Sequence, residues 1–424
     1  MNAYCISRRG QIPNIRSIIT KVFLILFAII LFDSIAADAR SKSIRWWPES
    51  TPTSTPSLTL APTPTPTPST TSGLNKLIEW GWDAPTTKYV KNNIATMEKK
   101  PFDGIVIKML YKNSSLSTWP FGSYWMNIND SYLQTDIANL KATNFVKFKD
   151  NFVVVITSPN APFIDWFDDW SRYIANIKVV AQAAKNAGLK GIILDTENYN
   201  SSYRTIMWQY DQQKYASTKT LDDYKAQAKL RGQQIMDAIN SVYPDITILV
   251  TFGTGSVAYW QSKGWGWKPY ELVIPFLDGM ISHMNTPARI VDGFEPSYPF
   301  KLESDFAAGY SAITVKGENI SSVPNQYASF VSAGFGLWFN YKGYEKNCST
   351  THDWNTTNFG CNYFTPDDFR KSVCLALTYS ESYLWVWSGT GSYPNWWTGS
   401  NLPQAYIDAL AQGKANYESG TGCQ

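Results

Sequence analysis

The chain has 424 residues, of which 44% are hydrophobic and 17% are charged. This composition supports a sizeable apolar core and excludes an intrinsically disordered protein. The formal net charge is only +3, and no long basic run occurs in the part expected to fold, so nucleic acid is not an expected partner. Aromatic residues make up 15% of the chain. Most of them must pack in a core, but some could stack on flat apolar faces such as sugar rings.

The N-terminus is typical of an export signal. Arg8, Arg9, Arg16 and Lys21 precede the apolar run at 22–32, which is shorter than the ~20 residues that span a bilayer. The small-residue sequence "AADA" follows. We therefore predict a signal peptide over 1–39, a secreted or cell-surface protein, and no stable membrane span after cleavage. An uncleaved anchor is the alternative.

A linker is expected over 40–73, because residues 50–72 are a tract of Pro, Thr and Ser with nothing to pack in a core. The folded domain is expected at 74–424.

Strand-like and helix-like segments alternate through that domain. Apolar strand-like runs occur at 77–82, 104–110, 152–158, 191–197, 246–252, 279–285, 335–341 and 382–388. Helical patterns occur at 86–100, 170–188, 221–240, 325–334, 365–380 and 402–417. Eight strands that are apolar on both faces, with helices between them, predict an α/β fold, a (β/α)₈ TIM barrel in a single domain. A doubly wound open sheet is the alternative, but no Gly-rich phosphate loop follows the first strand.

The ends of the predicted strands carry polar and aromatic residues, whereas their beginnings are plain. TIM barrels place their active sites at the C-terminal strand ends. We therefore predict that the substrate is bound by residues at those ends: Trp82, Asp83, Tyr199, His283, Asn285, Trp338, Asn340, Trp385 and Trp387. The tryptophans would stack on sugar rings, and the polar residues would bind hydroxyl groups. For each of them, a role in packing is the alternative.

Two acids end the fourth predicted strand, in the sequence "GIILDTENY". Side chains alternate along a strand, so Asp195 and Glu197 should point the same way, about 6–7 Å apart. Repulsion and burial should hold one of them protonated. A protonated carboxyl beside an ionised one suits glycoside hydrolysis. The alternative is a structural pair bound to a neighbour such as Lys108.

Other catalytic arrangements find less support. The seventh predicted strand offers no carboxylate before Glu345, so a second acid on that strand is not expected. A G-x-S-x-G nucleophile elbow is absent and only two histidines occur, which disfavours an esterase.

The strand end Asp195-x-Glu197-x-Tyr199 resembles that of family 18 glycoside hydrolases, the chitinase-like barrels. The segments "SHMN" at 282–285 and "LWVWS" at 384–388 fit the same comparison, and "GWDAPTTKYV" is similar to segments of secreted glycoside-hydrolase-like barrels. The resemblance implies that Glu197 is the acid and that Asp195 orients the N-acetyl group of the substrate, which is itself the nucleophile. It also implies that Trp385 or Trp387 forms the floor under the sugar.

The chain departs from that family at three places. Residues 191–194 are apolar where the family has further acids, "TSPN" replaces a Ser-x-Gly-Gly segment, and Asn285 stands where an Asp is expected. Our first hypothesis is a secreted glycoside hydrolase acting on a polysaccharide or oligosaccharide. The second is a catalytically inactive carbohydrate-binding barrel, a lectin or surface adhesin.

The cysteines fit an exported protein. Cys348, Cys361, Cys374 and Cys423 remain after signal cleavage and predict up to two disulfides. Pairing Cys348 with Cys361 and Cys374 with Cys423 is the most local arrangement, but three pairings are possible. We expect no metal site and no cofactor, because no Cys-x-x-Cys spacing occurs.

Overall fold

The computed structural model describes residues 74–109, 128, 130–157, 164–197, 207–264, 268–341, 354–389 and 394–424. The predicted signal peptide and linker, residues 1–73, lie outside the described residues.

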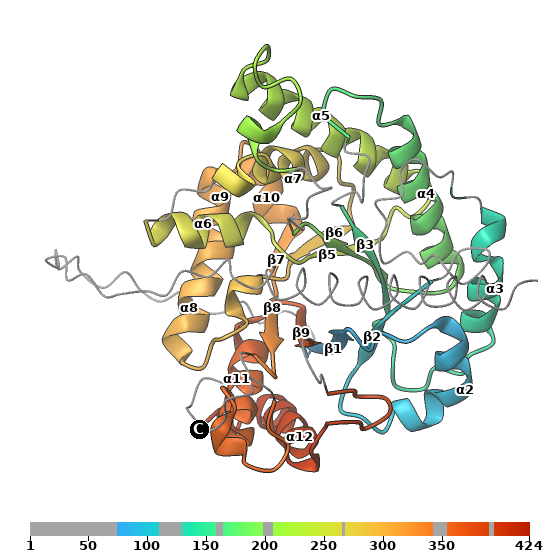
Figure 1. Ribbon diagram of the computed structural model, residues 1–424, viewed down its shortest axis with the longest axis vertical. Helices are drawn as coiled ribbons and strands as arrows, with labels where there is room; N and C mark the ends of the chain where they lie inside the picture. Colours follow the sequence, from blue (N-terminus) through green and yellow to red (C-terminus); the bar gives the residue numbers. More distant parts are fainter. Residues whose placement is uncertain are drawn as a thin grey trace, which may run out of the picture. The chain divides into compact units, whose positions relative to one another are not determined.

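The domain is a barrel of parallel strands surrounded by helices, which confirms the predicted fold class (Figure 1). The strand order is β7-β6-β5-β4-β3-β2-β1-β9-β8, and every pair is parallel. The strands are β1 Lys76–Gly81, β2 Gly104–Ile107, β3 Phe152–Ile156, β4 Gly191–Asp195, β5 Thr247–Val250, β6 Arg289–Asp292, β7 Val331–Ala333, β8 Phe335–Trp338 and β9 Tyr383–Ser388.

The short strands β7 and β8 together occupy the seventh strand position of the barrel. Only Gly334 separates them, and β7 pairs with β6 while β8 pairs with β9, so this one segment closes the ring. The Gly334 N–H donates to the Asp292 carbonyl at 2.8 Å. A Cβ at Gly334 would lie 2.7 Å from Val291 Cγ1, so glycine permits the close approach at this corner. The nine strands therefore form eight positions around the barrel, which is the number that the sequence predicts.

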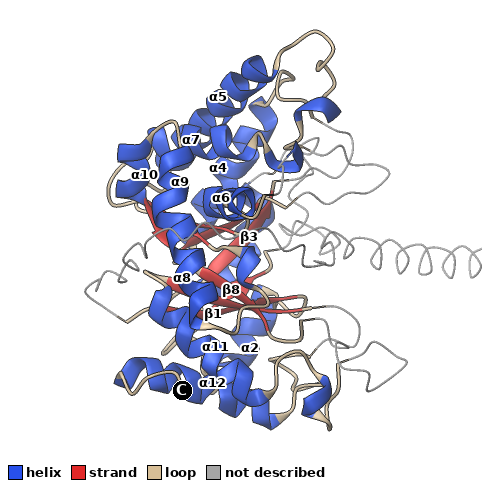
Figure 2. Ribbon diagram, turned by 90° about the vertical axis from the view of Figure 1, so that its left-hand side faces the viewer, coloured by secondary structure: helices blue, strands red, loops and turns tan. Residues whose placement is uncertain are grey.

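Helices cover the outside of the barrel, and the strands lie between them (Figure 2). The longer ones are α2 Thr87–Met97, α3 Asp130–Lys141, α4 Ser171–Asn186, α5 Leu221–Asn240, α6 Thr254–Ser262, α7 Val273–Ser282, α8 Glu303–Ser311, α11 Pro366–Tyr379 and α12 Gln404–Ser419. The short helices are α9 Gly317–Ile320 and α10 Pro324–Phe330. Threonine hydroxyls cap α2, α5 and α11, and Gly188 follows the end of α4 in the left-handed conformation.

The barrel interior is filled by side chains. The Trp385 ring is fully buried inside it, and its indole N–H donates to the Gly293 carbonyl at 2.8 Å, across the barrel from β9 to the end of β6. A Cβ at Gly336 would lie 2.6 Å from this ring, so glycine makes room for it. The interior is a packed core rather than a channel.

The sixth predicted strand is wrong. Residues 279–285 belong to the end of α7 and the turn after it, and the sixth strand is β6, ten residues later in the chain. The segment "GMISHMN" is apolar because α7 packs against α5 and the barrel wall, and its helical neighbours Phe276 and Leu277 are buried as well. A short apolar run cannot distinguish a buried helix from a buried strand.

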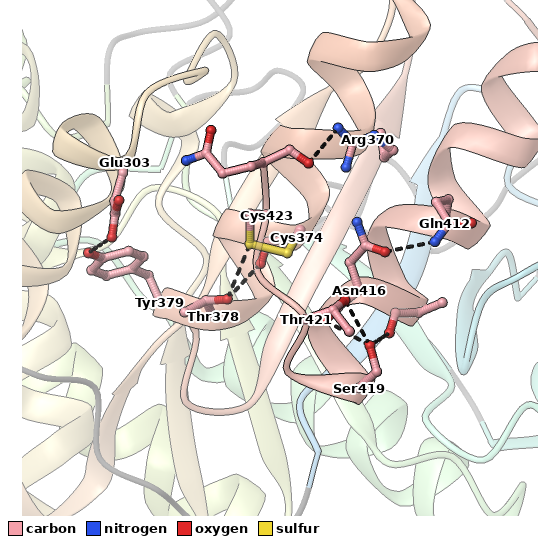
Figure 3. The surroundings of a disulfide bond; sticks show 12 residues. Glu303, Arg370, Cys374, Thr378, Tyr379, Gln412, Asn416, Ser419, Thr421 and Cys423 are labelled. Carbon is pink, nitrogen blue, oxygen red and sulfur yellow. Dashed lines mark hydrogen bonds between the residues drawn. A yellow bond between two sulfur atoms is a disulfide. The ribbon is translucent and has the colours of Figure 1, made fainter.

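Cys374 and Cys423 form a disulfide that ties α11 to the C-terminal segment (Figure 3). Cys361 is disulfide-bonded too, and its predicted partner Cys348 lies outside the described residues. No helix in the described part of the chain is both long enough and apolar enough to cross a bilayer.

Candidate active site

Asp195 lies at the C-terminal end of β4 and points into the barrel. It pairs in register with Ile156 of β3. The register from β9 through β1 and β2 to β3 places Ile156 on the same, inward-facing side of the sheet as Trp385. One carboxylate oxygen, Oδ1, accepts the Glu197 backbone N–H at 3.0 Å and lies 3.4 Å from the Thr251 hydroxyl. Asp195 is only 1% exposed. Glu197 follows it beyond the strand end and is half-buried.

Glu295 is the acid that the sequence analysis missed. It begins the short helical turn Glu295–Ser297 directly after β6. The preceding residue, Phe294, adopts a left-handed conformation with φ 45° although it carries a bulky side chain. Such backbone strain is uncommon outside glycine and gathers at functional sites. The Phe294 ring is fully buried, and its N–H donates to Asp292 at 3.2 Å, so the fold holds this turn in place.

The carboxyl groups of Glu197 and Glu295 lie within hydrogen-bonding reach of each other. Burial, the neighbouring Glu197 charge and, more weakly, Asp195 raise the pKa of Glu295 well above its usual range. The raised pKa favours the protonated form of Glu295 within this pair. The site brings two glutamates together from β4 and β6, where the sequence predicted only the two acids of one strand.

Tyr298 completes this group. Its hydroxyl donates to Glu295 Oε1 at 3.0 Å. The ring lies edge-on between Trp338, with centroids 5.6 Å apart, and Trp385, at 5.3 Å. Burial raises the pKa of Tyr298 too, so the hydroxyl remains a donor.

Tryptophan side chains gather on the β8, β9 and β1 side of the strand ends. Trp82 is 47% exposed and lies edge-on to the half-buried Trp387, with centroids 5.8 Å apart. Trp338 is also half-buried. Trp82, Trp338 and Trp387 thus keep the accessible surface that a sugar needs for stacking, whereas the buried Trp385 fills the barrel beneath them.

Other predicted binding residues do not join the acids. Asn340 is buried, and its amide binds Trp338 Nε1 and both backbone groups of Gly389. His283 and Asn285 precede β6, so they lie at the opposite end of the barrel. The His283 Nδ1 atom is 2.8 Å from Asp237 on α5. Tyr199 lies outside the described residues.

Asp83 belongs to a second, separate carboxyl pair. Its oxygens accept from Ser388 Oγ at 2.9 Å and from the Trp396 N–H at 2.7 Å. It faces Glu79 on β1, which is in register with Val386 and so points away from the inward Trp80 and Trp385. Asp83 therefore lies with Glu79 in the layer outside the barrel wall, just beyond the end of β1.

The site offers no support for a resident metal. Among the described residues, no group of three or more His, Cys, Asp or Glu side chains is arranged to hold an ion.

No family model matches the chain, and no curated protein matches it. Solved structures similar to it include the family 18 chitinase ChiB from the chitin utilization locus of Flavobacterium johnsoniae, with 10% identity, TM-score 0.36, and coverage of 81% of this chain and 95% of that one. Another is a mutant of PbGH5A, a family 5 glycoside hydrolase of Prevotella bryantii B14 in complex with a xyloglucan tetradecasaccharide, with 11% identity, TM-score 0.41, and coverage of 78% and 88%. A third is the 3-keto-D-glucoside 4-epimerase YcjR of E. coli, with 11% identity, TM-score 0.36, and coverage of 80% and 99%. The resemblance to glycoside hydrolases is distant, and it carries no argument about function.

The site combines a carboxyl whose pKa is raised with a second carboxyl in contact with it, at the mouth of a barrel and beside accessible aromatic rings. It can donate a proton and can stabilise a developing positive charge. A signal for Glu295 is present in "RIVDGFEPSYP", where an apolar run leads through a glycine to an acid. The apolar part of this sequence is shorter than the apolar segment at 279–285. For that reason the sequence predicts the sixth strand at 279–285 instead.

Proposed function

We propose that this protein is a glycoside hydrolase that cleaves glycosidic bonds of a polysaccharide or oligosaccharide. The contact between Glu197 and Glu295 is the observation that carries the proposal. Glycoside hydrolysis needs a proton donor for the leaving oxygen and a negative charge near the sugar carbon. A carboxyl pair that holds one proton supplies both.

Glu197 is assigned to proton transfer because it is the less buried member of the pair, while Glu295 is 5% exposed. In the free protein the shared proton is bound to Glu295 and forms the hydrogen bond to Glu197. When the glycosidic oxygen takes a proton through Glu197, the charge left on the pair stabilises the positive charge on the sugar ring. A water molecule then adds its hydroxyl to the sugar carbon and returns one proton to the pair.

Asp195 supports Glu197 from below through the backbone hydrogen bond, and Trp82, Trp338 and Trp387 are assigned to stacking on sugar rings. We also propose that the protein acts outside the cytoplasm, which the Cys374–Cys423 disulfide supports.

The test is to incubate the protein with a panel of polysaccharides and to measure new reducing ends. Glu197→Gln and Glu295→Gln keep the side-chain size and should each reduce the rate by ~10²–10⁴-fold, the usual contribution of general acid catalysis. Circular dichroism should show unchanged folding. Sugar binding without cleavage, equal in the wild type and in Glu197→Gln, would instead establish the inactive carbohydrate-binding barrel.

A further inference from the structure

Glu295 is held from two directions by one tyrosine. The Tyr298 hydroxyl donates to Glu295 Oε1 at 3.0 Å, and the Tyr298 N–H donates to the Glu295 carbonyl at 3.0 Å. Tyr298 thus fixes both the turn and the carboxyl of the same residue. Only one of the two carboxyl oxygens, Oε2, remains free of the tyrosine.

The tyrosine itself has little freedom to move. Its ring is wedged edge-on between Trp338 and Trp385, and it is 8% exposed. Its carbonyl accepts the Trp338 N–H at 3.4 Å. The neighbouring Ser297 hydroxyl donates to the Gly336 carbonyl at 2.8 Å, and the Gly336 N–H donates back to it at 3.0 Å. The turn after β6 is therefore fastened to β8.

The same contacts reach the aromatic rim. The Trp338 indole N–H donates to Asn340 at 2.9 Å, and Asn340 in turn binds both backbone groups of Gly389. A Cβ at Gly389 would lie 2.5 Å from Trp387 and 2.7 Å from Trp82, so both rings lie directly against this glycine. Hydrogen bonds and ring contacts thus connect Glu295, through Tyr298, to the rings that are accessible to a sugar.

We propose that Tyr298 is a positioning residue, which holds Oε1 of Glu295 so that the other oxygen and its proton face Glu197. This inference rests on the proposed function for its catalytic meaning, although the positioning itself can be measured without a substrate. Tyr298 does not exchange a proton with the substrate. It sets the direction of the carboxyl and, because a hydrogen bond to a carboxylate favours the charged form, it also limits how far burial raises the pKa of Glu295.

The first experiment measures Glu295 directly in the absence of substrate. Glutamate labelled with ¹³C at the side-chain carboxyl is incorporated into the protein, and the Glu295 signal is assigned by its loss in Glu295→Gln. Removing the hydroxyl in Tyr298→Phe should move the carboxyl titration of Glu295 to higher pH. An unchanged titration would overturn the proposal whether or not the protein is an enzyme.

The second experiment measures the pH dependence of hydrolysis on a substrate that the wild type cleaves. Tyr298→Phe should lower kcat by about 10–150-fold with KM changed by less than about threefold, because a hydrogen bond to a charged group contributes ~1.5–3 kcal/mol. The alkaline limb of the pH profile should move to higher pH, since it reports the loss of the proton that the pair shares.

A matched control is available at the other end of the barrel. Tyr310 donates a comparable hydrogen bond of 2.9 Å to Glu381, which precedes β9. Tyr310→Phe should leave both the Glu295 titration and the pH profile of the rate unchanged. Equal effects of the two variants would show a general loss of packing and would overturn the positioning role. If Glu197→Gln and Glu295→Gln retain full activity, the proposed function fails, and the titration of Glu295 still decides the role of Tyr298.

Discussion

The barrel contains two pairs of carboxyl groups in which the two members contact each other. One pair lies inside the barrel wall and the other lies outside it. Glu197 and Glu295 meet at the strand ends of β4 and β6, and one of them is half-buried. Glu79 and Asp83 meet in the outer layer, where they are 0% and 8% exposed. In both pairs burial is the main cause that raises the pKa of a glutamate well above its usual range.

The comparison shows that a raised pKa does not by itself identify a catalytic acid. The outer pair has no accessible member, and Asp83 is held by Ser388 and Trp396 as a structural group would be. Lys108, which also interacts with this pair electrostatically, partly offsets the rise in the pKa of Glu79. The inner pair combines the same electrostatics with access to the mouth and with accessible tryptophans, and only this combination supports catalysis.

The largest effect that separates the pairs should be on activity. We expect Glu197→Gln to reduce kcat by ~10²–10⁴-fold, because it removes the carboxylate through which the proton reaches the glycosidic oxygen. The matched change Glu79→Gln should leave kcat within about threefold of the wild type. Steady-state hydrolysis at a temperature at which both variants are folded checks this, and comparable losses in both would contradict the assignment of the inner pair.

The next effect should be on stability and should belong to the outer pair. Asp83→Ala leaves the buried Trp396 N–H and the Ser388 hydroxyl without their acceptor. A buried donor without a partner costs ~1–3 kcal/mol, so the free energy of unfolding measured in urea should fall by about that amount. The kcat measured below the melting transition should stay near that of the wild type. A stability equal to that of the wild type would show that water replaces the lost carboxylate.

The pH dependence of stability should reveal the outer pair as well. Because the pKa of Glu79 is higher in the folded than in the unfolded protein, its contribution to stability is fully present below about pH 4.3 and is lost as the pH rises toward the folded pKa. Each pKa unit of difference corresponds to about 1.4 kcal/mol. Glu79→Gln should therefore be more stable relative to the wild type at pH 8 than at pH 4. Melting curves across this range give the answer, and a constant difference would mean that Glu79 does not titrate as a buried acid.

The smallest effect should be on substrate affinity. Trp387→Ala removes a half-buried ring beside Trp82 and leaves both carboxyl side chains of the inner pair unchanged in sequence. Aromatic stacking contributes ~0.5–1.5 kcal/mol, so KM should rise about 2–10-fold with little change in kcat. Trp397→Ala is a suitable control, since Trp397 is also half-buried but packs on Phe102 in the outer layer. An unchanged KM in Trp387→Ala would remove this ring from the binding surface.

Much of the architecture follows from local patterns in the chain. Parallel strands covered on both faces are apolar along their whole length. Seven of the eight strand positions could therefore be predicted from apolar runs, as at Phe152–Ile156 and Gly191–Asp195. The helix ends also depend on local residues, since threonines cap α2 and α5 and a left-handed Gly188 follows α4. Asp195 and Glu197 could be expected at a strand end because strand alternation requires no knowledge of distant residues.

The tertiary structure alone decided which acids meet. Glu197 and Glu295 are far apart in the chain, and their contact depends on the true position of β6 and on the left-handed turn at Phe294. The segment at 279–285 has the same apolar character as a buried strand, but in the structure it continues α7, which packs against α5. Likewise, Asp83 contacts Glu79 and the Trp396 backbone in the outer layer, although its place after the first strand resembles that of a mouth residue. Local sequence determines where helices and strands begin and end, through the spacing of apolar residues and through capping residues. Which side chains become buried, and which acids contact each other, depends on how the barrel closes.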